Sequence, residues 1–152
     1  MNRTGQLAQC TVFGRERKPL LDFLSSYDNR LFQLKNGGNR FRADGIFLSG
    51  IEGGHPYLFA PGENVRYFRR FEGACIVSCG LSQKNTVSIS SVTDERLIFS
   101  LLRELPVMGE TREVQEIPSR RSAMLSPELA CLAAGLLLVC GIPPEDFMNI
   151  DF

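Results

Sequence analysis

The sequence lacks the features that would assign its 152 residues to a membrane or a secretory class. The uncharged apolar segment from Leu129 to Ile142 covers only fourteen residues, whereas a bilayer span needs about 20. At the N-terminus, Gln6, Gln9 and Thr11 interrupt any apolar run before it reaches the length of a signal-peptide core. We therefore expect no membrane segment and a cytoplasmic location.

The cysteines lack the spacing of a metal site, and their number is odd. The Cys75 to Cys79 interval is the most suggestive, but residues four apart in a strand share a face about 13 Å apart, too far for one ion. We expect reduced thiols in an apolar core, with no metal and no cofactor. The five cysteines are Cys10, Cys75, Cys79, Cys131 and Cys140.

The net charge is zero, although the charged residues are unevenly distributed along the chain. Residues 1–70 hold eleven Lys and Arg against six acids, and residues 71–152 hold six against eleven. This polarity allows head-to-tail attraction between copies or a basic face for phosphates, and it is also compatible with an ordinary solvated surface. The overall charge makes nucleic acid an unlikely partner. The length and the hydrophobic content of 43% suit a single domain over residues 1–152.

The segment SPELACLAAGLLLVCGIPP, residues 126–144, predicts a helix over 127–140. Ser126 can cap the first free amides, Pro127 fits the first helical position, and Gly141 followed by prolines ends the helix. Because this helix is apolar nearly all round, a sheet with neighbouring helices or a second copy of the chain must cover it. For the second case, we expect an interface formed by Leu129, Leu132, Ala133 and Leu136.

The rest of the chain alternates short apolar runs with helical segments, which is typical of a layered α/β fold with a mixed sheet flanked by helices. Expected strands are 9–13, 30–34, 45–48 and 74–79, and expected helices are 18–26 and 63–71. After residue 80, alternating runs over 86–92, 96–102 and 111–117 predict an antiparallel β extension of the sheet. A linker over 118–125 would then lead into the closing helix.

The order of features in residues 74–147 is that of a known domain. A strand ending in glycine (ACIVSCG), a polar hairpin (RLIFSLL to EVQEI) and a small-residue helix ending in Gly-Ile-Pro-Pro-Glu follow one another. This order resembles the C-terminal lobe of the central domain of Mur ligases, the ATP-dependent ligases that add amino acids to peptidoglycan precursors. ADGIFLSG, residues 43–50, is similar to the family's strand before its Asn-x-Asp-Asp segment. The resemblance implies a Rossmann-like fold and a bacterial protein.

The sequence departs from that family at the phosphate machinery. Mur ligases use a glycine-rich loop ending in Gly-Lys-Ser/Thr, whose amides and lysine hold the phosphates. Here the lysines are Lys18, Lys35 and Lys84, and none follows glycine in that pattern. Met124-Leu125-Ser126-Pro127 replaces the family's His-Asn-x-x-Asn, and the sequence ends at Phe152 before an amino-acid-binding domain. We therefore expect a shortened, non-catalytic relative.

Three loops carry candidate binding residues. The loop after Cys79 follows an expected central strand, where open α/β sheets bind ligands, so Gly80, Ser82, Lys84 and Asn85 are candidates for holding an anion. Alternatively, Ser82 and Asn85 only satisfy loop amides. His55, the single histidine, lies in a glycine-bearing segment and is a second candidate, with an ordinary turn as the alternative. The third, Asn36 to Asn39, is better explained as a hairpin turn.

These observations leave two hypotheses of different kinds. The first is a non-catalytic domain that acts by self-association, as a homodimer, or by binding a protein partner. The second is a small-ligand module or small enzyme that uses the loop after Cys79, with a nucleotide or a peptidoglycan precursor as the ligand.

Overall fold

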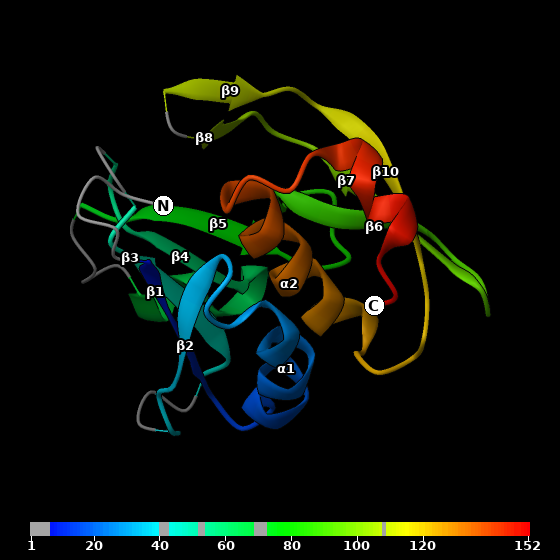
Figure 1. The fold of residues 1–152 in the computed structure, drawn as a ribbon. Helices are drawn as coiled ribbons and strands as arrows, with labels where there is room; N and C mark the ends of the chain where they lie inside the picture. Colours follow the sequence, from blue (N-terminus) through cyan, green and yellow to red (C-terminus); the bar gives the residue numbers. More distant parts are fainter. Residues whose placement is uncertain (1–6, 40–42, 52–53, 69–72, 108) are drawn as a thin grey trace.

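The computed structural model describes residues 7–39, 43–51, 54–68, 73–107 and 109–152 and is dominated by an eight-stranded sheet (Figure 1). The strand order is β10-β7-β6-β5-β4-β3-β1-β2. These strands are β1 (Ala8–Phe13), β2 (Phe32–Asn36), β3 (Gly45–Ser49), β4 (Tyr57–Pro61), β5 (Cys75–Cys79), β6 (Val87–Val92), β7 (Arg96–Leu101) and β10 (Gln115–Arg120). A separate hairpin pairs β8 (Leu105–Val107) with β9 (Glu110–Arg112).

The sheet is mixed, as expected for the layered α/β class. Strands β1 and β2 are parallel, and so are β4, β5 and β6, whereas β3 runs antiparallel to both of its neighbours. Beyond β6 the sheet continues through the antiparallel pairs β6–β7 and β7–β10, which confirms the predicted antiparallel extension. Only one residue pair, Cys79 with Val87, joins β5 to β6, so β6 begins where β5 ends. The loop between these two strands therefore lies at that edge.

Three of the expected elements differ from the structure. The segment 63–71 was expected to be an α-helix, but it forms a 3-10 helix, η2 (Gly62–Phe68), and its remaining residues lie outside the described part. The expected strand 111–117 is divided between β9 and β10, because residues 110–112 pair with β8 and residues from 115 pair with β7. Part of the expected linker is strand as well, since Pro118 lies inside β10, an edge strand that tolerates proline.

Two local interpretations failed because the partners of a strand are decided at long range. The segment Asn36 to Asn39 is not a hairpin turn between neighbouring strands, because β1 lies between β2 and β3 in the sheet. Instead the Asn36 side chain accepts hydrogen bonds from Gly38 N and Arg17 Nε, both at 2.9 Å. Strand β4 is not among the expected strands, because its sequence, YLFAP, directly follows the glycine-bearing segment that contains His55.

The long helix α2 (Pro127–Val139) has the predicted ends. Ser126 Oγ accepts a hydrogen bond from Leu129 N at 3.3 Å, and Pro127 occupies the first turn. At the other end Gly141 adopts a φ of +99°, a left-handed conformation that favours glycine, and Ile142 N donates to Leu137 O. The helix therefore begins and ends where its local sequence requires.

The chain itself covers helix α2. Every residue from Leu129 to Val139 is buried, against strands of the sheet and beside α1 (Arg17–Leu24). Gly135 permits the closest approach, because a Cβ at this position would lie 3.1 Å from the Phe59 ring and 3.5 Å from Val87. Leu129 is 7% exposed, and Leu132, Ala133 and Leu136 are fully buried. The four residues expected to form an interface thus lie within the chain's own core.

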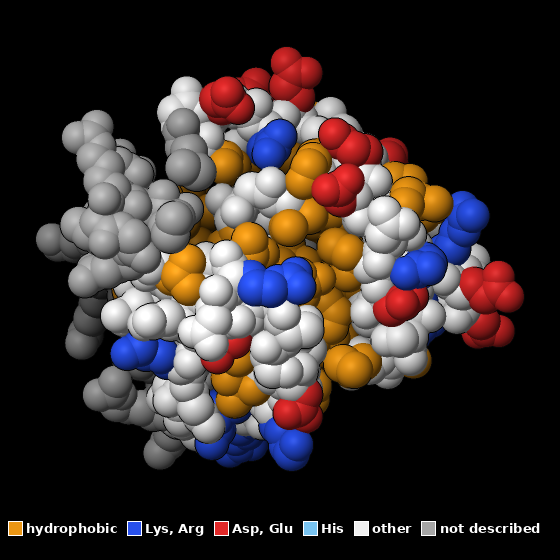
Figure 2. Space-filling model, in the orientation of Figure 1, with side chains coloured by type: hydrophobic (Ala, Val, Ile, Leu, Met, Phe, Trp, Pro, Cys, Tyr) orange, Lys and Arg blue, Asp and Glu red, His pale blue; other side chains and the backbone are white. Residues whose placement is uncertain are grey.

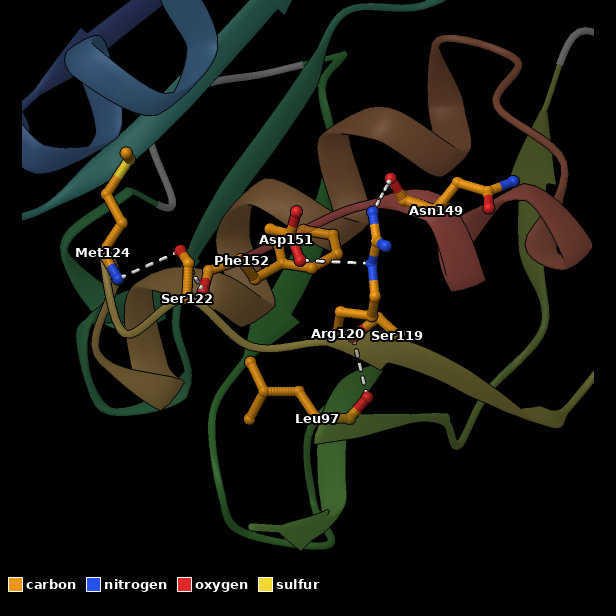
Figure 3. A network of polar contacts seen from close by, with 8 residues as sticks. All are labelled: Leu97, Ser119, Arg120, Ser122, Met124, Asn149, Asp151 and Phe152. Atoms are coloured by element: carbon orange, nitrogen blue, oxygen red, sulfur yellow. Dashed lines mark hydrogen bonds and ion pairs between the residues drawn. The ribbon is translucent and has the colours of Figure 1, made fainter. Parts of the chain in front are cut away.

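The C-terminal segment also packs on this face of the sheet. The 3-10 helix η3 (Pro144–Asn149) and Phe152 bring two buried aromatic rings against Phe99, with centroids 6.2 Å and 4.9 Å away. Figure 3 shows how Arg120 connects this segment to β10. Its Nη2 donates a hydrogen bond to Asn149 O at 2.9 Å, and its Nε forms an ion pair with Asp151 Oδ1 at 3.1 Å. Next to it, Ser122 Oγ donates to Phe152 O. These contacts position the loop that leads into α2.

Among the residues that the structure describes, fewer cover the opposite face of the sheet. Phe13, Leu58, Ala60 and Phe68 form a separate buried cluster there, with Ala43. Phe68 comes from η2, and its ring packs edge-on against Phe13 at 5.6 Å between centroids. Alternating side chains of β4 divide between the two faces, with Tyr57 and Phe59 towards α2 and Leu58 and Ala60 towards η2.

Each of the five cysteines is a free thiol, which agrees with the expected reduced core. Burial raises the pKa of Cys140 to about 12. Burial also raises the pKa of Cys10, and the neighbouring Cys140 is a secondary cause. No helix in the described residues has the length and hydropathy needed to cross a bilayer.

Candidate functional site

A cavity of about 830 Å³ opens where strands β4 and β5 end. One wall runs from the end of β4 into η2, from Pro61 to Val65, and a second is the loop from Gly80 to Asn85. The third wall is the first turn of α2, with Leu129 and Leu132 as its apolar part, and Glu16 and Asp44 complete the rim. Because β4 and β5 are parallel, their carboxyl ends meet at one edge, where α/β sheets commonly bind ligands.

The side chain of Asn85 packs between two of these walls. It is 5% exposed, and it lies between two glycines. A Cβ at Gly62 would collide with Asn85 Oδ1, and a Cβ at Gly80 would stand 3.0 Å from Asn85 Nδ2. Gly80 also has a φ of +148°, which side chains rarely adopt. The two glycines at the strand ends thus make room for a buried amide.

The loop after β5 is held partly by hydrogen bonds within itself. Ser82 Oγ accepts from Lys84 N at 3.2 Å, and Ser82 O accepts from Asn85 N at 3.1 Å and from Asn85 Nδ2 at 3.0 Å. Thr86 N donates to Ser78 O and Oγ. Ser82 therefore satisfies a loop amide, as the alternative for that residue expects, whereas the Asn85 side chain donates to a loop carbonyl.

Carboxylates outnumber cations around the cavity. Glu16, Glu63 and Glu128 are exposed, and Asp44 is half-buried, whereas Lys84 is the one cationic side chain among the lining residues that the structure describes. One oxygen of Asp44 is already engaged, because Oδ1 accepts from Glu16 N at 2.8 Å. A net negative rim of this kind attracts positive groups and repels anions.

One thiol lines the cavity and a second lies near it. Cys79 lines the cavity from the end of β5, and Cys131 lies one turn into α2. Burial raises the pKa of Cys131 to about 12, although a hydrogen bond from the Gly80 backbone acts in the opposite direction. Burial likewise raises the pKa of Cys79 well above its ordinary value, with Cys131 a secondary cause. Both groups are therefore neutral thiols at physiological pH.

The structure separates the predicted binding residues into two groups. Gly80, Ser82, Lys84 and Asn85 all line the cavity. His55 is exposed and precedes β4 at its other end, roughly 20 Å away for six extended residues. His55 is therefore not part of this site.

Sequence reasoning missed the residues that other segments bring to the cavity. Asp44 precedes β3, Glu63 follows β4, and Glu128 starts α2, so nothing in their local patterns connects them. A usable signal was present for Glu63, because an apolar run from Tyr57 to Ala60 that ends in Pro61-Gly62 predicts a strand end, with Glu63 directly after it. Asp44 carried no such signal.

The arrangement does not resemble a metal centre. Among the described residues, no group of three or more His, Cys, Asp or Glu side chains is placed to hold an ion. Comparisons with protein-family models, with curated proteins and with solved structures found no match for this chain. The site must therefore be interpreted from its own chemistry.

Proposed function

We propose that this protein is a small-ligand-binding α/β domain whose site is the cavity at the ends of β4 and β5. One observation carries the proposal: three segments far apart in the sequence, η2, the loop after β5 and the start of α2, wall a single space of about 830 Å³. That volume lies in the range of small-molecule sites. Four residues selected from the sequence, Gly80, Ser82, Lys84 and Asn85, belong to its lining.

The burial of helix α2 favours this function over association through that helix. A partner would have to displace parts of the chain's own core to reach Ala133 or Leu136. Self-association through another surface stays a prediction, and Figure 2 shows hydrophobic side chains gathered in the middle of the helix-bearing face. Kinship to Mur ligases and a cytoplasmic location likewise remain proposals, for which the layered α/β fold and the reduced thiols are the support.

The proposal is tested by a thermal-shift screen with two matched variants. Leu81 stands at the cavity and is 53% exposed, and Val114 is 58% exposed and lies outside the lining. We expect Leu81→Trp to obstruct the cavity and Val114→Trp to leave it open. A ligand at 100 times its dissociation constant should stabilise the wild type and Val114→Trp by about 2.7 kcal/mol, and Leu81→Trp much less.

The screen should include nucleotides, uridine-diphosphate sugar peptides, amino acids and amines, and light scattering of the same samples measures any association. Binding that Leu81→Trp leaves unchanged would place the site elsewhere. No stabilisation by any compound would contradict a ligand-binding function.

A further inference from the structure

We infer that Asn36 is a modification site: it deamidates through attack by the Gly37 amide, at a rate that the pairing of β2 with β1 controls. The inference is independent of the cavity and of its proposed ligand. It concerns the one Asn-Gly pair in the sequence, which lies at the end of β2, a strand at the edge of the sheet.

The reaction needs no reagent other than water. The Gly37 nitrogen loses its proton and attacks Asn36 Cγ, the side-chain nitrogen leaves as ammonia, and a five-membered succinimide ring forms. Water then adds to one of the two ring carbonyls: attack on the side-chain carbonyl gives aspartate, and attack on the main-chain carbonyl gives isoaspartate. Glycine favours the first step because it has no side chain to obstruct the approach of its nitrogen.

Separate contacts explain why the fold keeps each member of this reactive pair. A Cβ at Gly37 would lie 2.8 Å from Thr11 Cγ2, so β1 leaves little room for a larger residue. Asn36 Oδ1 accepts hydrogen bonds from Gly38 N and Arg17 Nε, both at 2.9 Å, and so connects the end of β2 to the start of α1. Replacing either residue would therefore disturb the junction of β1, β2 and α1.

In the folded chain both reacting groups are engaged in other contacts. Gly37 N donates to Val12 O at 2.7 Å, so attack requires this hydrogen bond to break. Asn36 lies within β2, and ring closure needs a backbone ψ far from the extended value of a strand. The Asn36 amide is restrained by Arg17, whose Nη1 donates in turn to Gly14 O at 2.9 Å. We therefore expect reaction only after the end of β2 separates from β1, because attack needs the two groups correctly oriented.

The two products have different consequences for this junction. Aspartate at position 36 would keep an oxygen for Gly38 N and would form an ion pair with the Arg17 guanidinium. Isoaspartate would add one carbon to the main chain at the same position and so displace Gly37 from Val12 O. Because strand ends open more readily than the whole protein unfolds, the reaction would record how often this edge of the sheet opens.

The experiment incubates the full chain at neutral pH, either folded or in concentrated urea, and follows deamidation by mass spectrometry of a proteolytic digest. We expect Asn36 to react at least about tenfold more slowly in the folded chain, because the hydrogen bonds at the end of β2 must first open. Asn85, which is followed by Thr86, is the internal control and should react much more slowly than Asn36 in urea. Equal rates at Asn36 in the two states, or no faster reaction at Asn36 than at Asn85 in urea, would overturn the inference.

Two variants of α1 test whether Arg17 restrains the amide. Arg17→Ala removes a donor to Asn36, whereas Lys18→Ala, the matched control, removes an exposed ammonium that pairs with Asp22 at 3.0 Å. In the folded state Arg17→Ala should react about three- to tenfold faster than the wild type and Lys18→Ala at the wild-type rate, and all three should react alike in urea.

A slower reaction of folded Arg17→Ala would show that the guanidinium activates the amide instead of restraining it, and would contradict the inference. Equal rates of the two folded variants would do the same. Urea unfolding of each variant establishes that it is folded, and the comparison of folded and unfolded wild type tests the inference without either variant.

Discussion

The two faces of the eight-stranded sheet differ in the depth of their cover. On one face, α1, α2 and η3 cover the sheet, as Figure 1 shows, and the continuous core beneath them includes Phe59, Phe99 and Phe147. On the other face, the described residues form a small separate cluster of five buried side chains, one of them from η2. Neighbouring residues of β4 belong to different faces, so this strand contributes to both clusters. In the described part of the chain, most of the buried apolar side chains therefore lie on the helix-bearing face.

The candidate site lies where these two covers meet. Leu129 and Leu132 come from the deep core, whereas Gly62 to Val65 come from the thin cover, and Asn85 packs between the strand ends. Local stability tends to be lower where fewer apolar contacts are buried. We therefore expect the wall formed by η2 to tolerate change, and the wall formed by α2 to be rigid.

The largest difference between the faces should appear on truncation of one leucine on each. Leu48 faces the deep core and Leu58 the thin cluster, and both are fully buried. Leu48→Ala should cost about 4 kcal/mol in the free energy of unfolding, and Leu58→Ala about 2 kcal/mol, because the thin cover can relax into the space. Urea unfolding measures both values. Equal losses would show that the two faces contribute alike.

An intermediate effect is expected at the junction between the covers. Gly62→Ala places a Cβ against Asn85 Oδ1 and should cost about 1 to 3 kcal/mol. In an Asn85→Ala background the same change should cost much less, with a coupling energy of about 1 kcal/mol in a double-mutant cycle. Gly54→Ala serves as the control, since its nearest neighbour would be Ile51 at 3.5 Å. Additive effects of the two changes would show that Asn85 does not interact with the side chain introduced at position 62.

The smallest effect concerns the thiols of the deep core at alkaline pH. The pKa of Cys10 is raised by burial above its ordinary value of 9.0, so the unfolded chain ionises first. The stability linked to this thiol is fully present below pH 9 and is lost as the pH rises above that value. Between pH 8 and pH 10 we expect the free energy of unfolding of Cys10→Ala to fall by about 1 kcal/mol less than that of the wild type.

The half-buried Cys75, whose pKa burial also raises, provides the comparison. Cys75→Ala should change the fall in the free energy of unfolding at alkaline pH less than Cys10→Ala does, because a less buried thiol ionises more easily in the folded protein. The free energy of unfolding from urea titrations at both pH values gives the two differences. An identical pH dependence in wild type and Cys10→Ala would mean that this thiol ionises as easily in the folded protein.

Local sequence was a good guide wherever a few neighbouring residues decide the structure. The caps of α2 were predicted from Ser126, Pro127 and Gly141, because each acts on backbone groups within four residues of itself. The loop after Cys79 was predicted as a site because it follows a strand, which is again a local relation. The Asn36 segment was misjudged for the opposite reason: its dipeptide signal is local, but the partner of β2 is β1.

The sequence by itself determined the class of the fold, the ends of α2 and one wall of the cavity, since capping, periodicity and loop composition act over short distances. Tertiary structure alone decided that the chain covers α2 and that β4 lies between β3 and β5. It also decided that Asp44, Glu63 and Glu128 meet around one space. The physical reason is that strand pairing and core packing are chosen by contacts between residues far apart in the chain, whose free energies no short pattern contains.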